Sequence, residues 1–240
     1  MSKIKTAKEI LLSKPLTFHE DHYCEKCLYP RYSGEDCLEC RRIARKDKET
    51  LAKWIEMIGG LKAWKEYTDE RFIKTNYNRL AYEGAKRYDY RKGSILFTGP
   101  RGTGKSHLAA IIKRPIIVSG QRVATISMPD LLGKIKAGIK DGEILESAIR
   151  TAVCGPVLSL EDVGVEKPSE WVVSEVYYRI IDGRYKAAKT GMIITMNQNL
   201  DQLESLWSRF DPAGRVVSRL WEMCGKNIFS LQGECDYRRG

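Results

Sequence analysis

Short apolar runs alternate with segments of helical periodicity from residue 94 onward. Three mostly apolar runs have the length of buried strands: residues 94–98, 157–160 and 192–196. Between the last two runs, Val172, Val176 and Ile180 recur at i, i+4 and i+8, which predicts a helix over residues 171–189 with one apolar face. This alternation predicts an α/β fold, in which helices flank a parallel sheet.

An amphipathic helix precedes this region. Leu51, Trp54, Ile55 and Ile58 form an i, i+3, i+4, i+7 stripe after a basic stretch at residues 41–46, and a Gly-Gly pair ends the pattern. We expect an N-terminal module with its linker helix over residues 1–58 and a main domain over residues 59–240. The charged face of the helix is compatible with phosphate contacts and with simple solvation.

The composition indicates a folded domain with a basic surface. The chain has 240 residues, of which 42 % are hydrophobic and 30 % charged, and this excludes wholesale disorder. Its 41 Lys and Arg against 31 Asp and Glu give a net charge of +10, which favours a polyanionic partner without establishing one. No apolar run approaches the ~20 residues of a membrane span. Residues 1–16 lack the apolar core of a secretory signal, so we expect a cytoplasmic protein without a membrane partner.

Four cysteines near the N-terminus form the pattern C-x2-C-x9-C-x2-C: Cys24, Cys27, Cys37 and Cys40. Each two-residue gap lets both thiolates of one turn face a single ion, and four thiolates complete the tetrahedral shell that suits Zn²⁺. A closed shell predicts a structural zinc ion that stabilises a small module. His19 and His22 lie close enough in the sequence to compete as ligands.

The predicted zinc module is locally acidic, since residues 20–40 hold six Asp and Glu against two Lys and Arg. This charge favours docking to a protein over binding to phosphates, although the cysteine spacing itself does not distinguish protein from DNA. The remaining cysteines are expected to pack as small hydrophobic side chains: Cys154, Cys224 and Cys235.

The most specific motif is a complete G-x-x-x-x-G-K-S between the first apolar run and a helical segment. It consists of Gly99, Pro100, Arg101, Gly102, Thr103, Gly104, Lys105 and Ser106, and His107 follows it. In such a P-loop, backbone N–H groups surround the β-phosphate, the lysine reaches the β- and γ-phosphate oxygens, and the serine hydroxyl binds Mg²⁺. We therefore expect ATP at residues 99–107, with magnesium at Ser106. Pro115 is expected to end or kink the following helix near Arg114.

Polar side chains end the other two apolar runs. Glu161 and Asp162 follow residues 157–160, and we expect one carboxylate to hold Mg²⁺ and the next to polarise the attacking water. Asn197 follows residues 192–196, where it can position that water. Ligands bind at the carboxyl ends of the strands in such folds, so these side chains are expected beside the P-loop.

The order of these motifs resembles the DnaC-type helicase loaders and the related IstB-type transposition ATPases, which are AAA+ proteins. The resemblance extends from residue 94 to the C-terminus and rests on five segments: residues 99–106, 160–164, 182–185, 193–197 and 214–220. It implies a P-loop AAA+ fold with a five-stranded parallel sheet, nucleotide bound between neighbouring subunits, and an arginine finger supplied in trans. The few residues after Arg219 resemble the loaders in leaving no room for a helical lid.

By position, the resemblance assigns a role to five residues. Glu161 and Asp162 become the Walker B pair, Asn197 becomes the sensor asparagine, and Arg219 and Arg215 become the arginine finger and its companion in an order that stays open. The family has Asp first in the Walker B pair, whereas here the longer Glu161 precedes the shorter Asp162. We therefore expect slow ATP hydrolysis, stimulated by DNA. Met196 stands where the family often has Thr, which bears on the geometry of the sensor.

Residues 76–92 interleave tyrosines with Arg and Lys, a composition that stacks bases and neutralises phosphates of single-stranded DNA. The same residues are equally compatible with wrapping the adenine or with simple packing. A second basic patch that could face DNA consists of Lys134, Lys136 and Lys140.

Three functions are compatible with these motifs. The first is ATP-dependent loading of a hexameric replicative helicase onto single-stranded DNA by a homo-oligomer, with the N-terminal module gripping the helicase, as the resemblance implies. The second is a transposition helper ATPase of the IstB type, with duplex DNA and a transposase as partners. The third is an adaptor that binds nucleotide without significant hydrolysis.

Overall fold

The computed structural model describes residues 49–137, 142–188 and 191–233. The chain divides into two units, Met1–Glu56 and Met57–Gly240, and the fold given below is that of the second. Residues 49–58 are helical, and the expected end of this helix at Gly59 and Gly60 is confirmed, because both glycines have positive φ. Several residues of interest lie outside the described ranges: Cys24, Cys27, Cys37, Cys40, His19, His22, Lys140 and Cys235.

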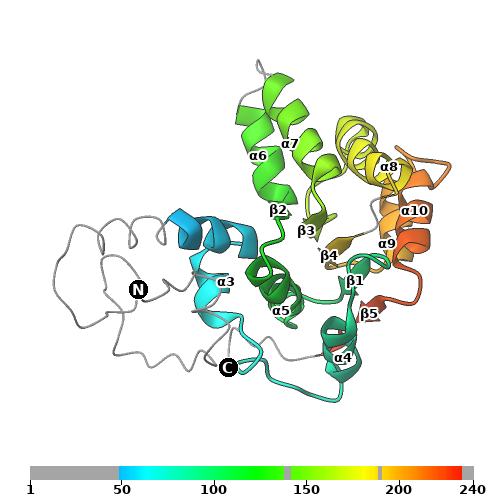
Figure 1. Ribbon diagram of the computed structural model, residues 1–240. Coiled ribbons are helices and arrows are strands. Elements are labelled where there is room, and N and C mark those ends of the chain that lie inside the picture. Colours follow the sequence, from blue (N-terminus) through cyan, green and yellow to red (C-terminus); the bar gives the residue numbers. More distant parts are fainter. Residues whose placement is uncertain (1–48, 138–141, 189–190, 234–240) are drawn as a thin grey trace, which may run out of the picture. The chain divides into compact units, whose positions relative to one another are not determined.

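Five parallel strands form one sheet at the centre of this unit (Figure 1). The strands are β1 (Ile95–Thr98), β2 (Val123–Ser127), β3 (Val157–Val163), β4 (Met192–Met196) and β5 (Ile228–Ser230), in the order β2-β3-β4-β1-β5. Every residue of β1 and β4 is buried, as expected for a parallel sheet with helices on both faces. The five-stranded sheet is confirmed, and the three predicted runs are β1, β3 and β4.

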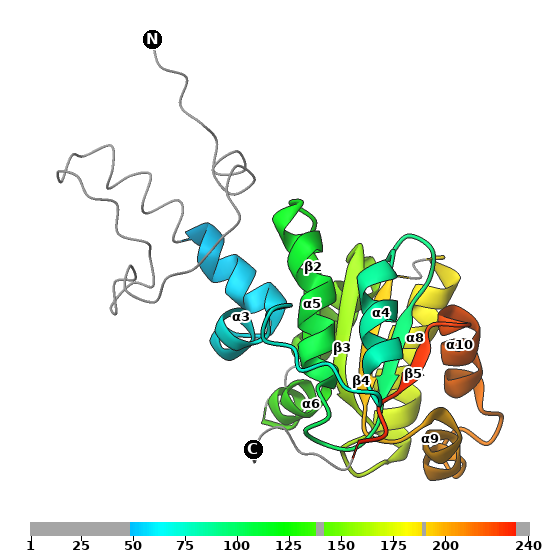
Figure 2. The ribbon, with the colours of Figure 1, turned by 90° about the horizontal axis from the view of Figure 1, so that it is seen from below.

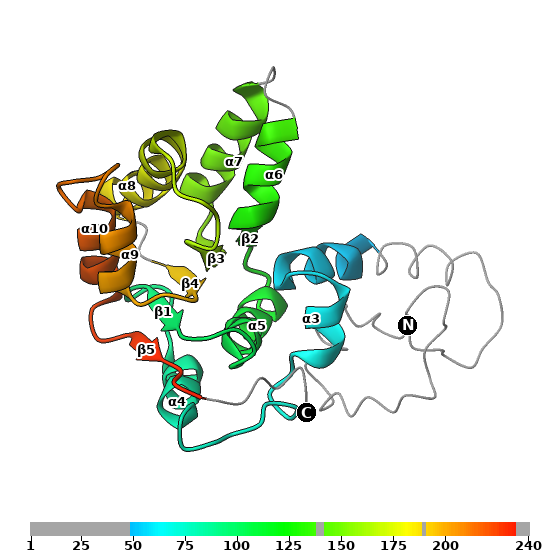
Figure 3. The same cartoon turned by 180° about the vertical axis from the view of Figure 1, so that it is seen from behind.

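Helices cover both faces of the sheet (Figures 1 and 3). One face carries α5 (Lys105–Val118), against which α3 (Leu61–Glu66) and α4 (Arg79–Arg87) pack. The other face carries α7 (Gly142–Cys154), α8 (Tyr178–Lys186) and α10 (Arg215–Cys224), and α9 (Leu200–Trp207) lies beside α10 (Figure 2). The π-helix η2 (Trp171–Tyr177) runs directly into α8, and α6 (Met128–Ala137) follows β2. The largest apolar cluster joins this second layer of helices to the sheet.

Two predicted helix boundaries and one predicted burial are wrong. The helix from Trp171 ends at Lys186 rather than Lys189, although the apolar face that predicted it is buried. Helix α5 does not end near Arg114: it continues through Pro115 to Val118, and the Pro115 carbonyl accepts a hydrogen bond from the Ser119 amide at 3.0 Å. Proline removes one amide donor but keeps its carbonyl, and apolar residues of this last turn are buried. Cys224 packs in the core as expected, whereas Cys154 is exposed.

The Asp-Gly-Arg-Tyr segment at residues 182–185 fastens the sheet to the second layer of helices. Arg184 is fully buried, and its guanidinium donates to the carbonyl oxygens of Ala152, Gly155 and Gly191 at 2.8, 3.0 and 3.1 Å. Those carbonyls belong to the end of α7 and to the turns that enter β3 and β4. Burial lowers the pKa of Arg184 to about 10, so the side chain stays charged near neutral pH. Gly183 is required for packing, since a Cβ there would lie 2.8 Å from Cγ2 of Val153.

In the described ranges, every helix is too short or too polar to cross a lipid bilayer.

We expect the substitution Arg184→Met to lower the free energy of unfolding by about 3 kcal/mol or more, because it removes the buried guanidinium that donates to the carbonyls of Ala152, Gly155 and Gly191. Chemical denaturation measures this change. Arg179→Met is the matched control, since Arg179 makes a partly exposed ion pair with Glu146 at 2.9 Å, a kind of pair that contributes about 1 kcal/mol or less. Equal losses in the two variants would contradict the anchoring role of Arg184.

Candidate functional site

The P-loop connects the carboxyl end of β1 to the first turn of α5. Gly99, Gly102 and Gly104 have φ of 133°, 80° and 95°, a region open mainly to glycine. A Cβ on Gly99 would lie 2.2 Å from the carbonyl oxygen of Leu231, because the segment after β5 runs alongside the loop. Lys105 Nζ donates to the carbonyls of Gly99 and Pro100 at 2.7 and 2.6 Å, so the lysine is folded back on its own loop.

An aromatic wall stands against the P-loop. The ring of His107 stacks on Tyr67 with centroids 5.1 Å apart and meets the edge of Phe72 at the same separation. His107 Nε2 lies 2.6 Å from the carbonyl oxygen of Thr68, and a Cβ on Gly104 would approach Phe72 to 3.2 Å. Burial lowers the pKa of His107, and the bond to the Thr68 carbonyl opposes this shift, so the neutral ring that donates from Nε2 is favoured near neutral pH.

The P-loop, the aromatic wall and the ends of β3 and β4 enclose one cleft of about 560 Å³. Among the predicted site residues, the cleft is lined by Arg101, Gly102, Thr103, Gly104, Lys105, Ser106, His107, Asp162 and Asn197. Further lining residues that the sequence did not single out are Lys62, Glu66, Tyr67, Arg71, Phe72, Ile73 and Val165. All of these except Val165 precede the first apolar run, and none belongs to a motif, so only the folded chain identifies them.

Glu161 is not among the residues that line the cleft. Its Oε1 lies 2.6 Å from Nζ of Lys113 on α5 and accepts a hydrogen bond from Oγ of Ser159 at 3.1 Å. The Lys113 side chain is 1 % exposed and that of Glu161 is 17 % exposed. Burial lowers the pKa of Lys113, and the adjacent carboxylate opposes that shift. The structure therefore separates the two carboxylates that the sequence pairs.

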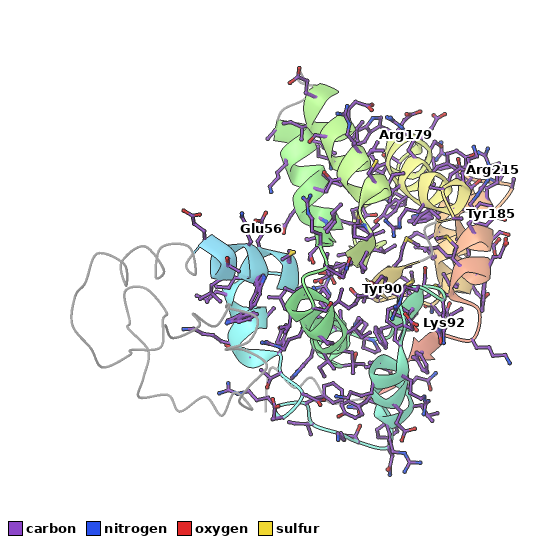
Figure 4. The ribbon with its side chains drawn as sticks, in the orientation of Figure 1. Glu56, Tyr90, Lys92, Arg179, Tyr185 and Arg215 are labelled. Atoms are coloured by element: carbon purple, nitrogen blue, oxygen red, sulfur yellow. The ribbon has the colours of Figure 1, made fainter. Side chains whose placement is uncertain are left out.

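Arg215 and Arg219 both lie on α10, and neither lines the cleft. Arg219 is 20 % exposed, bonds to Asp182 at 2.8 Å, and lies over the rings of Tyr178 and Tyr185. Arg215 is 53 % exposed and lies over Tyr178, with a 3.3 Å contact to Asp211. Figure 4 labels Arg215 and Tyr185 on the side of the sheet away from α5.

The tyrosine-rich segment at residues 76–92 does not line the cleft either. Tyr82 stacks on Phe72 and donates to Asp69 at 2.8 Å, and Tyr88 donates to the carbonyls of Gly93 and Met192. Tyr77 is 69 % exposed. Part of this segment therefore packs, as one of its three expected roles requires, and the residues immediately before it line the cleft instead. Lys134 and Lys136 are exposed on α6.

The turn after β3 is fixed by side chains from two other elements. The Gly164 amide donates to the Tyr177 hydroxyl at 3.1 Å, and the Gly164 carbonyl accepts from Gln198 Nε2 at 3.0 Å. Tyr177 in turn donates to Glu166 Oε1 at 2.7 Å. Burial raises the pKa of Glu166, against the lowering effect of the Tyr177 bond. The turn is thereby held between η2 and the residue that follows Asn197.

These residues fit a nucleotide with its magnesium ion. Gly102 and Gly104 line the cleft without a side chain between their backbone and a ligand. The Lys105 ammonium can exchange loop carbonyls for phosphate oxygens, and the Ser106 hydroxyl and Asp162 carboxylate are oxygen ligands of the kind Mg²⁺ takes. Over residues 49–137, 142–188 and 191–233, no group of three or more His, Cys, Asp and Glu side chains is arranged as a metal site. The predicted zinc ligands lie outside those ranges.

The fold and cleft define a P-loop nucleotide-binding domain, with the sheet and loop of an AAA+ protein. The family model of the IstB-like ATP binding protein matches residues 61–238, and the chain belongs to this family.

Relatives include proteins of two kinds. The chain is 30 % identical over 146 residues to the ATP-binding protein of insertion sequence IS5376 from Geobacillus stearothermophilus, a match that covers 60 % of this chain and 55 % of that protein. It is 26 % identical over 144 residues to the replicative helicase loader DnaC of Escherichia coli K12, covering 59 % and 58 %. The match thus spans a little over half the length of these relatives. The crystal structure of the DnaC helicase loader superposes with a TM-score of 0.56 and 27 % identity over 72 % of this chain and 99 % of that chain.

Because burial raises the Glu166 pKa, the folded chain binds this proton more tightly than the unfolded chain. The contribution of Glu166 to stability therefore increases as pH falls from above the raised pKa toward the ordinary value. We expect Glu166→Gln to unfold at higher denaturant than the parent chain at about pH 7.5, and this advantage to shrink by about pH 5. Glu175→Gln, at an exposed position of η2, is the control. A stability difference between Glu166→Gln and the parent that does not change with pH would contradict a raised pKa of the buried Glu166 carboxyl.

Proposed function

We propose that this protein binds ATP in the P-loop cleft and uses it to load a hexameric replicative helicase onto single-stranded DNA. The observation that supports this best is the DnaC structure, whose full chain superposes on the part of this protein that holds the cleft. The P-loop is complete, and residues from three strand ends meet in the cleft beside it. ATP hydrolysis is slow in this proposal, and the nucleotide state gates assembly.

Each polar residue of the cleft has a proposed role at the nucleotide. Lys105 leaves the Gly99 and Pro100 carbonyls and binds phosphate oxygens. Ser106 and a carboxylate at the end of β3 hold Mg²⁺, and Asn197 orients the attacking water. Magnesium, when bound, neutralises developing charge on the phosphates. Tyr67 and Phe72 present apolar surface to the base.

Arg215 and Arg219 would act on the nucleotide of a neighbouring subunit, since both lie away from the cleft of their own chain. Arg215 is the more exposed of the two, and Arg219 would have to leave Asp182 to reach a neighbour. This division makes a homo-oligomer the working form. The exposed Tyr77 and the lysines of α6 are the proposed contacts to single-stranded DNA.

Transposition offers a second candidate function. The family model and the insertion-sequence relative support a helper ATPase of the IstB type, which would pair with a transposase on duplex DNA. A nucleotide-binding adaptor without hydrolysis is the third. The partner that co-purifies with the chain distinguishes a helicase loader from a transposition helper. Measurable ATP turnover distinguishes both of these from the adaptor.

Lys105→Ala is expected to lower ATP hydrolysis in the presence of single-stranded DNA by roughly 100-fold or more, because it removes the cation that meets the β- and γ-phosphates. Lys226→Ala, an exposed lysine before β5, is the matched control and should hydrolyse ATP like the parent. Phosphate release measures both. Equal turnover in the parent and Lys105→Ala would remove catalysis from the proposal.

The N-terminal module, residues 1–58, is proposed to hold a structural zinc ion and to grip the helicase. We expect about one zinc ion per purified chain, and the paired substitution Cys24→Ser with Cys27→Ser to lose both the zinc and co-purification with a replicative helicase. Cys154→Ser controls for the loss of a thiol elsewhere. If the variant loses zinc but still co-purifies with the helicase, the zinc module does not dock the helicase. If the parent chain co-purifies with a transposase instead, the helper function is favoured.

A further inference from the structure

The two carboxylates at the end of β3 have different surroundings. Glu161 is paired with Lys113 at 2.6 Å, beneath α5, and Asp162 lines the cleft with Ser106 and Asn197. The sequence assigns both carboxylates to the nucleotide, whereas the structure separates them.

A bulge in β3 supplies that cause. Leu160 pairs with Ile194 and Val163 pairs with Met196, so Glu161 and Asp162 together oppose the single residue Thr195. Strand alternation turns the Glu161 side chain toward the α5 face. The extra residue of a bulge is re-aimed, and Asp162 has the left-handed φ of 56°, with its amide donating to Thr195 Oγ1 at 3.1 Å. Asp tolerates this conformation better than most residues, so the bulge costs little here.

The partner of Glu161 lies well below the phosphate loop. Lys113 and Ser106 lie on the same helix, seven residues or roughly 10 Å apart along its axis. Gly59 closes over the pair: a Cβ at this position would lie 3.4 Å from Lys113 Nζ and 3.8 Å from Glu161 Oε1. Beside it, Thr125 Oγ1 donates to the Met57 carbonyl. An ammonium as deeply buried as that of Lys113 is stable only with a paired anion, and Glu161 provides it.

We propose that Lys113 is a positioning residue that keeps Glu161 out of the cleft, and that Asp162, not Glu161, is the acidic residue that serves the magnesium ion of the bound nucleotide. This inference rests on the proposed binding of ATP in the cleft and refines it. The order of the two residues assigns the magnesium ion to Glu161, and this inference assigns it to Asp162 instead. It also explains why a glutamate stands where the resemblance implies aspartate, because only the longer side chain reaches Lys113.

The test is the affinity of the full chain for a fluorescent ATP analogue, measured with and without Mg²⁺ by titration. We expect Mg²⁺ to strengthen binding in the parent, and Asp162→Asn to lose about tenfold of that strengthening, because a charged contact is removed while asparagine keeps the left-handed backbone. The double variant Lys113→Met with Glu161→Gln removes both charges of the buried pair, so it leaves no unpaired ion. It should keep the magnesium dependence of the parent within about threefold.

The single variant Lys113→Met tests positioning. Release of Glu161 should lower the Mg²⁺ concentration at half-effect, and adding Glu161→Gln should restore the parent value, which a merely structural role of Lys113 would not produce. An unchanged midpoint in Lys113→Met removes the positioning role. Loss of magnesium dependence in the double variant, with Asp162→Asn unaffected, assigns the metal to Glu161 and overturns the proposal. A parent chain that binds no analogue overturns the proposed function, and this inference with it.

Discussion

The bulge at the end of β3 governs what the sheet presents to the phosphate loop. Two residues, Glu161 and Asp162, occupy the space of one against Thr195, so they cannot share an environment. One carboxylate enters the protein beneath α5, where it neutralises a lysine that is 1 % exposed, and the other lines the cleft. The ion pair of Glu161 and the position of Asp162 in the cleft are therefore two results of one backbone feature. A change in the bulge would leave the buried Lys113 ammonium without the Glu161 carboxylate. It would also move Asp162 relative to the cleft.

The rest of the domain keeps that edge rigid. Arg184 ties the entrances of β3 and β4 to the end of α7, and Tyr177 and Gln198 hold the turn that follows Asp162. Asp182, two residues before Arg184, pairs with Arg219 on α10. Residues 182–185 thus anchor the sheet through Arg184. Through Asp182 they also hold Arg219, which is proposed to act on a neighbouring subunit.

The strands and the P-loop follow from local sequence rules. The runs that form β1, β3 and β4 are apolar because both faces of the sheet are covered, and the loop glycines occupy positions with positive φ. The number of strands came from the resemblance, since β5 is only three residues long and carries no pattern of its own. The helix end expected near Arg114 did not occur: α5 continues through Pro115 to Val118, and apolar residues of its last turn are buried.

The details of the site could not be read from the sequence for a related reason. Lys113 looks like an ordinary polar position of a helix, and only the folded chain shows that it meets Glu161. Tyr67 and Phe72 reach the cleft through a loop with no motif, whereas the tyrosines of residues 76–92, whose role the sequence left open, do not line it. Contacts between distant segments decide such features, and neither periodicity nor spacing records them.

The most direct measurement is a crystal structure of this protein with magnesium and a non-hydrolysable ATP analogue. We expect the ion to lie on the Asp162 side of the cleft, bound directly or through its water, while Glu161 stays paired with Lys113. An ion coordinated by Glu161, with the pair to Lys113 broken, would contradict this expectation.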